Sequence, residues 1–338
     1  MYVTKEIDPL RSGVIIGQCM DNPDIMLPSH IRFLQYRGPK RMNPITVPQS
    51  NSNVGASTAA EWFSLKGTNM SVSTACSSAT HAIGMAALNI QHGIDDLIVT
   101  GGADAPLASY HFSGFDLLNA LSRRNDEPMR ASRPFDKDRD GFVLGEGAGI
   151  LVLEESEHAQ RRNAKIYAEL IGYGYTADAY NILAPDPYGE AAINAIHRAL
   201  AMGRLSPQEI EYINAHGTST IINDPNESYI IKQVFGDYAY KIQISSSKSY
   251  FGHTLGAAGG LESIVTLLAM ENGVIPPTSN LENPDLAYVD KTAPELDKRC
   301  DLDYVPGGSR EKVVNTALVQ SFGFGGQNGV LLFCKFAN

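Results

Sequence analysis

Short apolar runs alternate with amphipathic stretches along most of this chain. Residues 96–102 and 149–154 are nearly continuous runs of apolar residues and glycine, which is typical of buried strands. Residues 259–270 instead repeat apolar residues at helical spacing. Strands that alternate with helices predict a parallel sheet covered by helices, so we expect an α/β fold. Further strands are predicted at 168–175, 210–215, 242–246, 316–320 and 330–334, and further helices at 115–122, 189–202 and 224–235.

Two segments break this alternation. Prolines recur through residues 23–58, and because proline lacks the N–H that a helix interior needs, we expect loops there instead of long helices. Residues 285–303 form a segment that is longer than we expect by roughly ten residues, and we interpret it as a surface loop insertion, which a fold tolerates well.

The most informative stretch is residues 71–93. Residues 71–75 alternate small and β-branched side chains, and from Ser77 onward small and apolar residues recur at helical spacing. This pattern predicts a strand that turns sharply into a helix, with Cys76 at the turn. Unpaired N–H groups and the helix dipole at such a position favour the thiolate, the nucleophilic form of cysteine. A single cysteine near a helix start is more often structural, so its interpretation depends on the rest of the chain.

Two histidines strengthen the functional interpretation. His216 lies in the segment 214–220 and His253 in the segment 247–259. Each follows a short strand-like run and lies in a glycine-rich loop, where the backbone can approach a ligand closely. One histidine of this kind is usually structural, but a cysteine together with two such loops indicates nucleophilic catalysis on a carbonyl group.

Composition narrows the class of protein. The chain has 338 residues, of which 43% are hydrophobic, enough for a large core or for two fused α/β halves. No apolar run reaches the roughly 18 residues that a membrane span needs, and we find no signal or transit pattern, so we expect a cytoplasmic protein without a membrane span. The net charge of −10 argues against nucleic acid as a partner, because phosphate binding requires a basic surface.

The cysteines suggest free thiols in a reducing compartment. They are few and lack metal-ligand spacing, so we expect no metal site. They are Cys19, Cys76, Cys300 and Cys334.

Several segments together resemble a known family. The segments are Thr-Ala-Cys-Ser-Ser (74–78), Asn-Ala-His-Gly-Thr-Ser-Thr (214–220), Lys-Ser-Tyr-Phe-Gly-His (248–253), Ser-Phe-Gly-Phe-Gly-Gly-Gln-Asn (321–328) and the stretch 132–147. In this order they resemble the signature segments of β-ketoacyl-acyl-carrier-protein synthases of the synthase I/II type. The resemblance extends from about residue 13 to the end of the sequence, and the ordered set is very specific.

The resemblance implies a thiolase-like fold, with two α/β halves in a five-layered αβαβα arrangement. Residues 1–164 would form the half that carries the nucleophilic cysteine, and residues 165–338 the half that carries both histidines. Cys76 lies closer to the start of this sequence than the active cysteine does in the family. We therefore expect a first half that is shortened at its N-terminus.

The resemblance also implies an acyltransferase that performs a decarboxylative Claisen condensation in fatty acid or polyketide biosynthesis. Cys76 would take an acyl group from a thioester, because a thiolate both attacks and leaves readily. His216 and His253 would stabilise the enolate that forms when malonyl-acyl carrier protein loses carbon dioxide. The N–H groups of Cys76 and Phe324 would form the oxyanion hole, and Phe324 would also gate the acyl pocket.

The remaining site residues follow from the same resemblance. Lys248 would pair with Glu262 and orient the His253 loop, since a buried lysine is costly unless it is paired. Phe142 would shield the malonyl site from water. A solvent-exposed Lys248 and a Phe324 that only packs in the core are the structural alternatives. Residues expected to bind the substrate arm are Thr218, Thr220, Gly325 and Gly326.

The expected partners are an acyl carrier protein and a second ketosynthase chain, in a homodimer or a heterodimer. Lys40, Arg41 and Arg124 are candidates for docking the acidic carrier protein, although basic residues of this kind also occur on ordinary solvated faces. No cofactor is expected beyond the phosphopantetheine that carries the substrates.

Two other functions are compatible with parts of the sequence. A catalytically silent ketosynthase-like subunit or remnant would fit the early start, but retention of Cys76 argues against it. A thiolase acting on coenzyme A thioesters would share the fold, but it would need a second catalytic cysteine near the C-terminal glycine-rich loop, where residues 325–328 are Gly-Gly-Gln-Asn.

Overall fold

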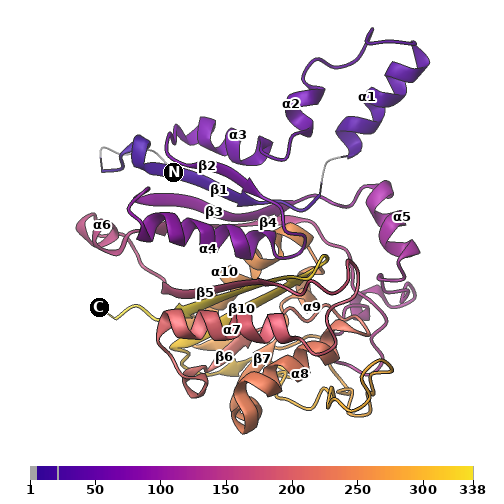
Figure 1. The fold of residues 1–338 in the computed structure, drawn as a ribbon, viewed down its shortest axis with the longest axis vertical. Helices are drawn as coiled ribbons and strands as arrows, with labels where there is room; N and C mark the ends of the chain where they lie inside the picture. The colour runs from indigo at the N-terminus through magenta and orange to yellow at the C-terminus, as the bar shows by residue number, and fades with distance from the viewer. Residues whose placement is uncertain (1–5, 21–22, 338) are drawn as a thin grey trace.

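The computed structural model describes residues 6–20 and 23–337, and in them two sheets enclose a central layer of helices (Figure 1). The first sheet has the spatial order β2 (Asn69–Val72), β1 (Ser12–Gly17), β3 (Leu97–Asp104) and β4 (Gly147–Glu154). The second has the order β5 (Glu169–Ala177), β11 (Gln327–Cys334), β10 (Thr316–Gly323), β6 (Tyr212–Asn214) and β7 (Gln243–Ser245).

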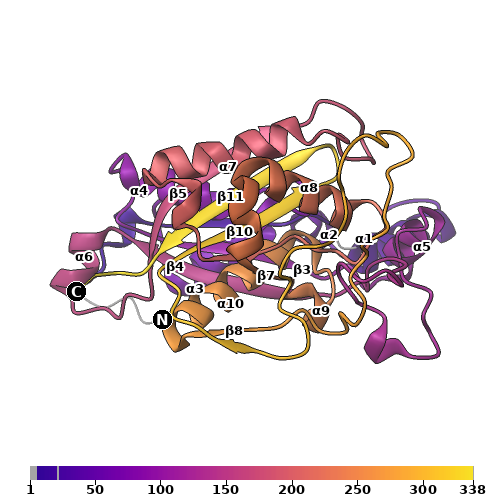
Figure 2. The ribbon, with the colours of Figure 1, turned by 90° about the horizontal axis from the view of Figure 1, so that it is seen from below.

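Helices complete the layers. The central layer contains α4 (Ser78–Gln91) and α10 (Ala258–Asn272), and the outer layers contain α3 (Val54–Phe63) on one side and α7 (Glu190–Gly203) and α8 (Asn223–Phe235) on the other (Figures 1 and 2). This is the five-layered αβαβα arrangement that the family resemblance implies. The remaining helices are α1 (Pro23–Gln35), α2 (Thr46–Ser50), α5 (Ser109–Leu117), α6 (Ser156–Arg161) and α9 (Lys248–Phe251), and β8 (Val274–Ile275) pairs with β9 (Arg310–Glu311).

The sheets are mixed, not parallel as the alternation of strands and helices led us to expect. β1 pairs in parallel with β2 and β3, but β4 is antiparallel to β3. In the second sheet β6 pairs in parallel with β7 and β10, whereas β11 is antiparallel to both β10 and β5. β4 also departs from the prediction of a buried strand, because Ile150 and Val152 are 41% and 49% exposed.

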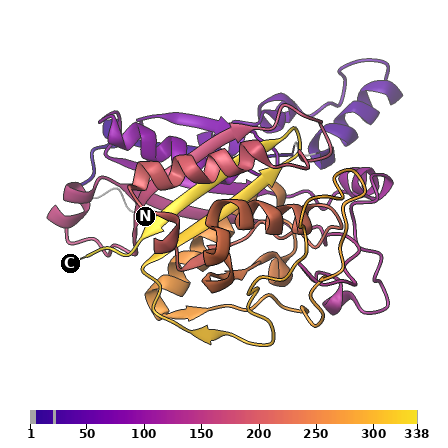
Figure 3. The same ribbon diagram turned by 60° about the horizontal axis from the view of Figure 1, so that its bottom comes forward.

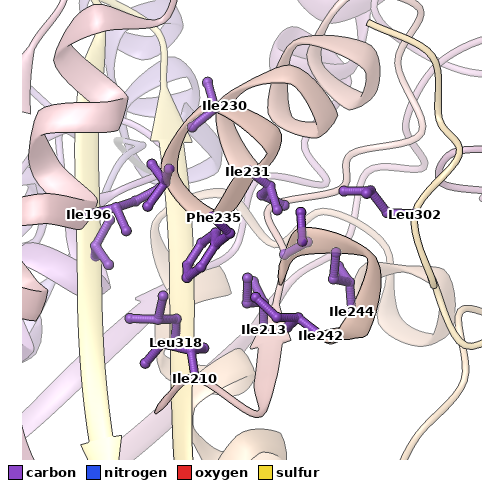
Figure 4. Packing of buried hydrophobic residues seen from close by; sticks show 14 of the residues in the cluster. Ile196, Ile210, Ile213, Ile230, Ile231, Phe235, Ile242, Ile244, Leu302 and Leu318 are labelled. Atoms are coloured by element: carbon purple, nitrogen blue, oxygen red, sulfur yellow. The ribbon is translucent and has the colours of Figure 1, made fainter. Parts of the chain in front are cut away.

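Apolar faces join the layers. Figure 4 shows part of a buried cluster in which Ile196 of α7 and Phe235 of α8 pack against Leu318 of β10. A second cluster joins Ile83 of α4 to Met270 of α10 and to residues of the second sheet. Because each half contributes side chains to this second cluster, the halves share one interior.

Three predicted segments differ from the structure. A helix forms over Pro23–Gln35 because Pro23 occupies its first position, where no helical N–H is needed, and Pro28 removes only one bond. The helix predicted at 115–122 instead spans Ser109–Leu117.

Residues 285–303 form no helix or strand, but they are not simply a surface loop. Ala293 and Cys300 are fully buried, and Lys298 forms an ion pair with Asp290 at 2.5 Å. The boundary predicted at residues 164/165 stays a prediction, as does the shortened first half. Among the described residues no helix combines the length and the apolar character that a membrane crossing requires.

Candidate active site

Cys76 lies in the tight turn between β2 and α4. The turn requires a left-handed backbone at Ala75, whose φ is 51°. The hydroxyl of Ser78 closes the turn, because it accepts the N–H of Thr74 at 2.9 Å and donates to the carbonyl of Ala75 at 2.6 Å. The side chain of Cys76 is only 7% exposed. The local sequence therefore fixes the thiol at the N-terminal end of α4, as predicted.

The second half holds this turn in place. The hydroxyl of Ser77 lies 2.9 Å from the carbonyl oxygen of Ser321 and 2.8 Å from that of Gln327. One turn further along α4, the hydroxyl of Thr80 lies 2.6 Å from that of Ser321. The position of the thiol thus depends on strands β10 and β11.

The backbone N–H groups of Cys76 and Phe324 lower the pKa of the Cys76 thiol. Burial nevertheless raises the pKa of this thiol to about 11, although the charge of Lys248 and the N–H groups lower it. We expected the helix N-terminus to favour the thiolate, but the cost of burying a charge is larger. The resting thiol is therefore protonated near neutral pH.

His216 follows β6 in a loop that Glu227 of α8 fixes. The Glu227 carboxylate accepts the N–H groups of His216 and Gly217, each at 2.7 Å. Burial raises the pKa of Glu227 to about 8, against the lowering effect of these two N–H groups. Sequence reasoning missed this residue, although an acidic side chain one turn before Ile230 and Ile231 on a helix is a signal of a buried polar role.

His253 follows α9, and its backbone N–H and carbonyl groups hydrogen-bond to the segment 143–145. Its N–H donates to the carbonyl of Val143 at 2.7 Å, and its carbonyl accepts the N–H of Gly145 at 3.0 Å. The ring centroids of His253 and His216 are 5.3 Å apart and the ring planes are 86° apart. Burial lowers the pKa of both imidazoles and the charge of Lys248 lowers it further, so both rings are neutral near pH 7.

Lys248 links one imidazole to a buried carboxylate. Its ammonium group forms an ion pair with Glu262, and its Nζ lies 3.2 Å from Nδ1 of His216. Both charged side chains are buried, with 1% and 0% of their surface exposed. The pairing of Lys248 with Glu262 is as predicted, and the contact with His216 is additional. Because an ammonium group only donates, it assigns the acceptor role to Nδ1 and the proton to Nε2 of His216.

A cavity of about 440 Å³ brings these groups together. Cys76, His216 and His253 line it, as do the aromatic rings of Phe142 and Phe324. Phe142 packs edge-on to His253, with ring centroids 5.3 Å apart. Phe324 is 38% exposed, so it lies toward the open side of the cavity and is not an ordinary core residue.

The residues predicted to bind the substrate arm also line this cavity. They are Thr218, Thr220, Gly325 and Gly326. The hydroxyls of Thr218 and Thr220 lie 2.9 Å apart. Gly325 and Gly326 have φ values of 77° and 71°, a backbone that favours glycine and keeps the Phe324 loop close to the turn of Cys76.

The predicted docking residues lie outside the cavity. Lys40 and Arg41 follow α1, and Arg124 follows α5; Figure 1 shows both helices on the same side of the molecule. Arg41 donates to the hydroxyl of Tyr36 at 3.0 Å, and Arg124 lies 3.7 Å from Glu127. Each guanidinium group therefore already has a local partner.

Asp104, at the end of β3, is a second buried acid that the sequence reasoning missed. Its carboxylate accepts the N–H groups of Cys19 and Met20, each at 3.1 Å, and that of Gly256 at 2.7 Å. Burial raises its pKa to about 6, although these N–H groups lower it. Asp104 therefore ties the end of β1 to the segment that follows His253.

Possible metal ligands are not clustered in the part of the chain that the structure describes. Within residues 6–20 and 23–337 no group of at least three His, Cys, Asp or Glu side chains is arranged to hold an ion. All four cysteines are free thiols, as the sequence analysis expected.

Comparisons with known proteins agree with the fold. Residues 2–159 match the model of the β-ketoacyl synthase N-terminal domain, and residues 167–282 match that of the C-terminal domain. Two proteins named 3-oxoacyl-[acyl-carrier-protein] synthase 2 are similar. The one from Synechocystis sp. is 46% identical over 334 residues, which are 99% of this chain and 77% of the relative. The one from Coxiella burnetii is 46% identical over 98% of this chain and 77% of its own.

Solved structures show the same similarity. A β-ketoacyl synthase from Burkholderia phymatum superposes with a TM-score of 0.89 at 35% identity, over 99% of this chain and 78% of its own. A type II polyketide ketosynthase, solved with its acyl-carrier protein and bound to the hexaketide, superposes with a TM-score of 0.90 at 34% identity, over 98% and 80%. The fold is therefore thiolase-like, and the chain belongs to the β-ketoacyl synthase family of condensing enzymes.

Proposed function

We propose that this chain is a 3-oxoacyl-acyl-carrier-protein synthase that joins a Cys76-bound acyl group to malonyl-acyl carrier protein with loss of carbon dioxide. The observation that carries the proposal is that a thiol, the backbone N–H groups of Cys76 and Phe324, and two neutral imidazoles meet at one cavity. The names of the similar proteins from Synechocystis and Coxiella support the same activity.

The first step is acyl transfer to the thiol. The sulfur of Cys76 attacks the carbonyl carbon of the acyl thioester, and the N–H groups of Cys76 and Phe324 bind the oxyanion that develops. The bond from carbon to the pantetheine sulfur then breaks. The proton from the Cys76 thiol ends on the released pantetheine thiol, so the step is balanced without a cofactor.

The second step is decarboxylation of the malonyl thioester. Carbon dioxide leaves, and the negative charge moves to the thioester oxygen as an enolate. Nε2 of His216 carries a proton because Lys248 occupies Nδ1, so it donates a hydrogen bond to this oxygen. His253 faces the same cavity and supplies the second donor, while Phe142 excludes water beside it.

The last step forms the new carbon–carbon bond. The enolate carbon attacks the acyl carbonyl on Cys76, the carbon–sulfur bond breaks, and the 3-oxoacyl product leaves on its carrier. The Cys76 thiolate then takes up a proton. Because the charge on each oxygen exists only transiently, fixed donors favour the transition states over the bound substrates.

The test is intact-mass spectrometry after incubation with a fatty acyl thioester. We expect one acyl adduct on the wild-type chain and none on Cys76→Ala. Cys19→Ala is the matched control, since Cys19 packs against the same buried cluster and should leave the adduct unchanged. Folded wild-type protein without an adduct would instead favour the alternative, a catalytically silent ketosynthase-like subunit.

The carrier-protein partner is tested with a second acyl donor. We propose that Lys40, Arg41 and Arg124 bind an acidic acyl carrier protein. A similar ketosynthase has been solved in complex with its acyl-carrier protein, which supports a partner of this kind. Replacing Lys40 and Arg41 by glutamate should slow acylation from the carrier-bound donor and leave acylation from a free thioester unchanged. Equal effects on both donors would contradict a docking role.

A further inference from the structure

Arg139 is a buried arginine that the proposed mechanism does not use. Its side chain is only 2% exposed, and it lies in the stretch 132–147. Burial lowers the pKa of Arg139, but the charge of Asp224 and the contact with Asp285 raise it by more, so the pKa lies above its usual value. A buried charge is costly unless it is hydrogen-bonded, so the partners of this guanidinium group indicate what it holds in place.

The guanidinium group of Arg139 bonds to one wall of the active-site cavity. Its Nε donates to the carbonyl of Thr220 at 2.8 Å, and its Nη2 donates to that of Ile221 at 3.1 Å. Thr220 and Ile221 line the cavity together with Cys76. They lie between β6 and α8, outside any helix or strand, so a side chain takes the place of the regular backbone partners of their carbonyls.

The backbone of Arg139 leads into a second wall of the same cavity. The three residues that follow it, Asp140, Gly141 and Phe142, line the cavity as well. The N–H of Gly141 donates to the carbonyl of Ser219 at 3.0 Å, so the two walls touch at this point. Arg139 therefore joins both walls and fixes the distance between them.

The segment 285–303 supports the guanidinium group from the side away from the cavity. Figure 3 shows this segment as an orange-yellow loop, which contacts α8 through an ion pair. The Asp285 carboxylate accepts Nη1 of Arg139 at 2.8 Å, and the guanidinium carbon lies 5.7 Å from the centre of the Tyr288 ring. Nη1 also donates to the carbonyl of Asp136 at 2.9 Å. Every nitrogen of the guanidinium group is thus bonded, which holds the group in one orientation.

We propose that Arg139 is a positioning residue for substrate binding, because it sets the width of the cavity where a pantetheine thioester reaches toward Cys76. The inference rests on the proposed function and names the residue that aligns Thr218 and Thr220 with the substrate arm. The hydroxyls of these two threonines lie 2.9 Å apart, so a shift of Thr220 also moves the partner of Thr218. A lysine could not replace Arg139, because one ammonium group lacks the planar fork that reaches both carbonyls and the carboxylate together.

The test measures the rate at which Cys76 of the full chain is acylated at increasing donor concentration, by intact-mass spectrometry. One donor is octanoyl-pantetheine, and the other is S-phenyl thiooctanoate, which lacks the pantetheine arm. Arg139→Lys should raise the half-saturating concentration of octanoyl-pantetheine about tenfold and leave its maximal rate within about twofold. The half-saturating concentration of S-phenyl thiooctanoate should not change, because this donor has no arm to align.

Two further variants complete the comparison. Asp285→Asn removes the ion pair that supports Arg139, and it should raise the half-saturating concentration of octanoyl-pantetheine alone, by about threefold. This variant also provides the test if Arg139→Lys does not fold. Arg162→Lys is the matched control and should change neither donor, since Arg162 binds the carboxylate of Glu154 at 2.6 Å and does not line the cavity.

The outcomes separate this inference from the proposed function. Equal effects of Arg139→Lys on both donors would show a general structural role and would overturn the inference. An unchanged half-saturating concentration of octanoyl-pantetheine would overturn it as well, while acylation of the wild-type chain would leave the proposed function in place. A wild-type chain that is acylated by neither donor would contradict the proposed function and, with it, the role of Arg139.

Discussion

Lys248 acts on three groups of the site at the residue scale. Burial is the larger effect at each of them, since it raises the pKa of Cys76 and lowers the pKa of His216 and His253, and the charge of Lys248 lowers the pKa of all three. Lys248 also balances the buried charge of Glu262, whose second carboxylate oxygen has no hydrogen-bond partner among the described residues. A buried pair of this kind is costly to break but is often replaceable by apolar residues without loss of stability.

The difference between breaking and replacing a buried ion pair gives a prediction for Lys248 and Glu262. Lys248→Ala should lower the free energy of unfolding by about 3–5 kcal/mol, because Glu262 is then buried without a partner. The double variant Lys248→Met with Glu262→Leu should recover most of this stability but not the condensation, since His216 loses the donor at Nδ1. Urea unfolding and a condensation assay on the same samples separate the two effects.

The exposed pair Lys165 and Glu271 is the control, because its lysine is 62% exposed. Lys165→Ala should change the unfolding free energy by less than about 1 kcal/mol. If the double variant condensed at the wild-type rate, Lys248 would have a structural role only.

The pH dependence of Cys76 is a second prediction at this scale. Burial raises its pKa to about 11, so the thiolate fraction, and with it the rate of alkylation by iodoacetamide, should rise roughly tenfold per pH unit from pH 6 to 9. The stoichiometry at Cys76 is read by mass spectrometry of the modified peptide. A rate that levels off near pH 7 would show a thiolate already formed in the resting protein.

At the scale of elements, glycines determine how closely helices approach the sheets. At Gly172 an added Cβ would lie 2.2 Å from the carbonyl oxygen of Ala199, and at Gly174 the corresponding contact with Ala195 is shorter still. The backbone of α7 cannot yield without moving the whole helix, so these two positions fix the distance between α7 and β5.

Gly174→Ala should therefore destabilise the fold by about 1–3 kcal/mol, the usual cost of overpacking. Gly114 of α5 is the control because no atom lies within 4 Å of its added Cβ, and Gly114→Ala should be neutral or slightly stabilising. Thermal unfolding of the two variants gives the comparison. Equal melting temperatures would mean that α7 shifts at little cost.

The spacing of apolar residues predicted most of the helices and strands, but not the direction of the strands or the hydrogen-bond partners of buried acids. The turn at Cys76 and the helices α7, α8 and α10 were predictable because their apolar residues have a clear spacing. The antiparallel direction of β4 was not, since direction depends on partners that lie far away in the chain. Glu227 and Asp104 were missed for a related reason. Their hydrogen-bond donors are backbone N–H groups, which every residue except proline carries, so the sequence does not indicate them.

At the scale of the whole molecule, the central layer joins the halves into one structure. Ile83 of the first half and Tyr212 and Val319 of the second belong to one buried cluster. The hydroxyl of Ser77 also bonds to carbonyls of the last two strands. We therefore expect the two halves to unfold together.

Unfolding in urea should therefore be a single transition. Pulse labelling of Cys76 in the first half and of Cys300 in the second should report the same midpoint as circular dichroism, because both thiols are buried in the native state. The labelled cysteines are identified by mass spectrometry. Midpoints that differ between the two thiols would show halves that unfold separately.

The hydrogen bonds between Ser77 and the last two strands also determine when, during synthesis of the chain, the turn of Cys76 can be completed. Ser77 and Ser321 are separated by 244 residues, so at a synthesis rate of about 5–20 residues per second a ribosome needs on the order of 12–50 s to travel between them. Throughout that interval the nascent chain has Cys76 but neither the loop of Phe324 nor the strands that fix its turn. Under the proposed mechanism the nucleophile is thus made early and becomes competent late, so we expect unfinished polypeptides not to capture acyl groups.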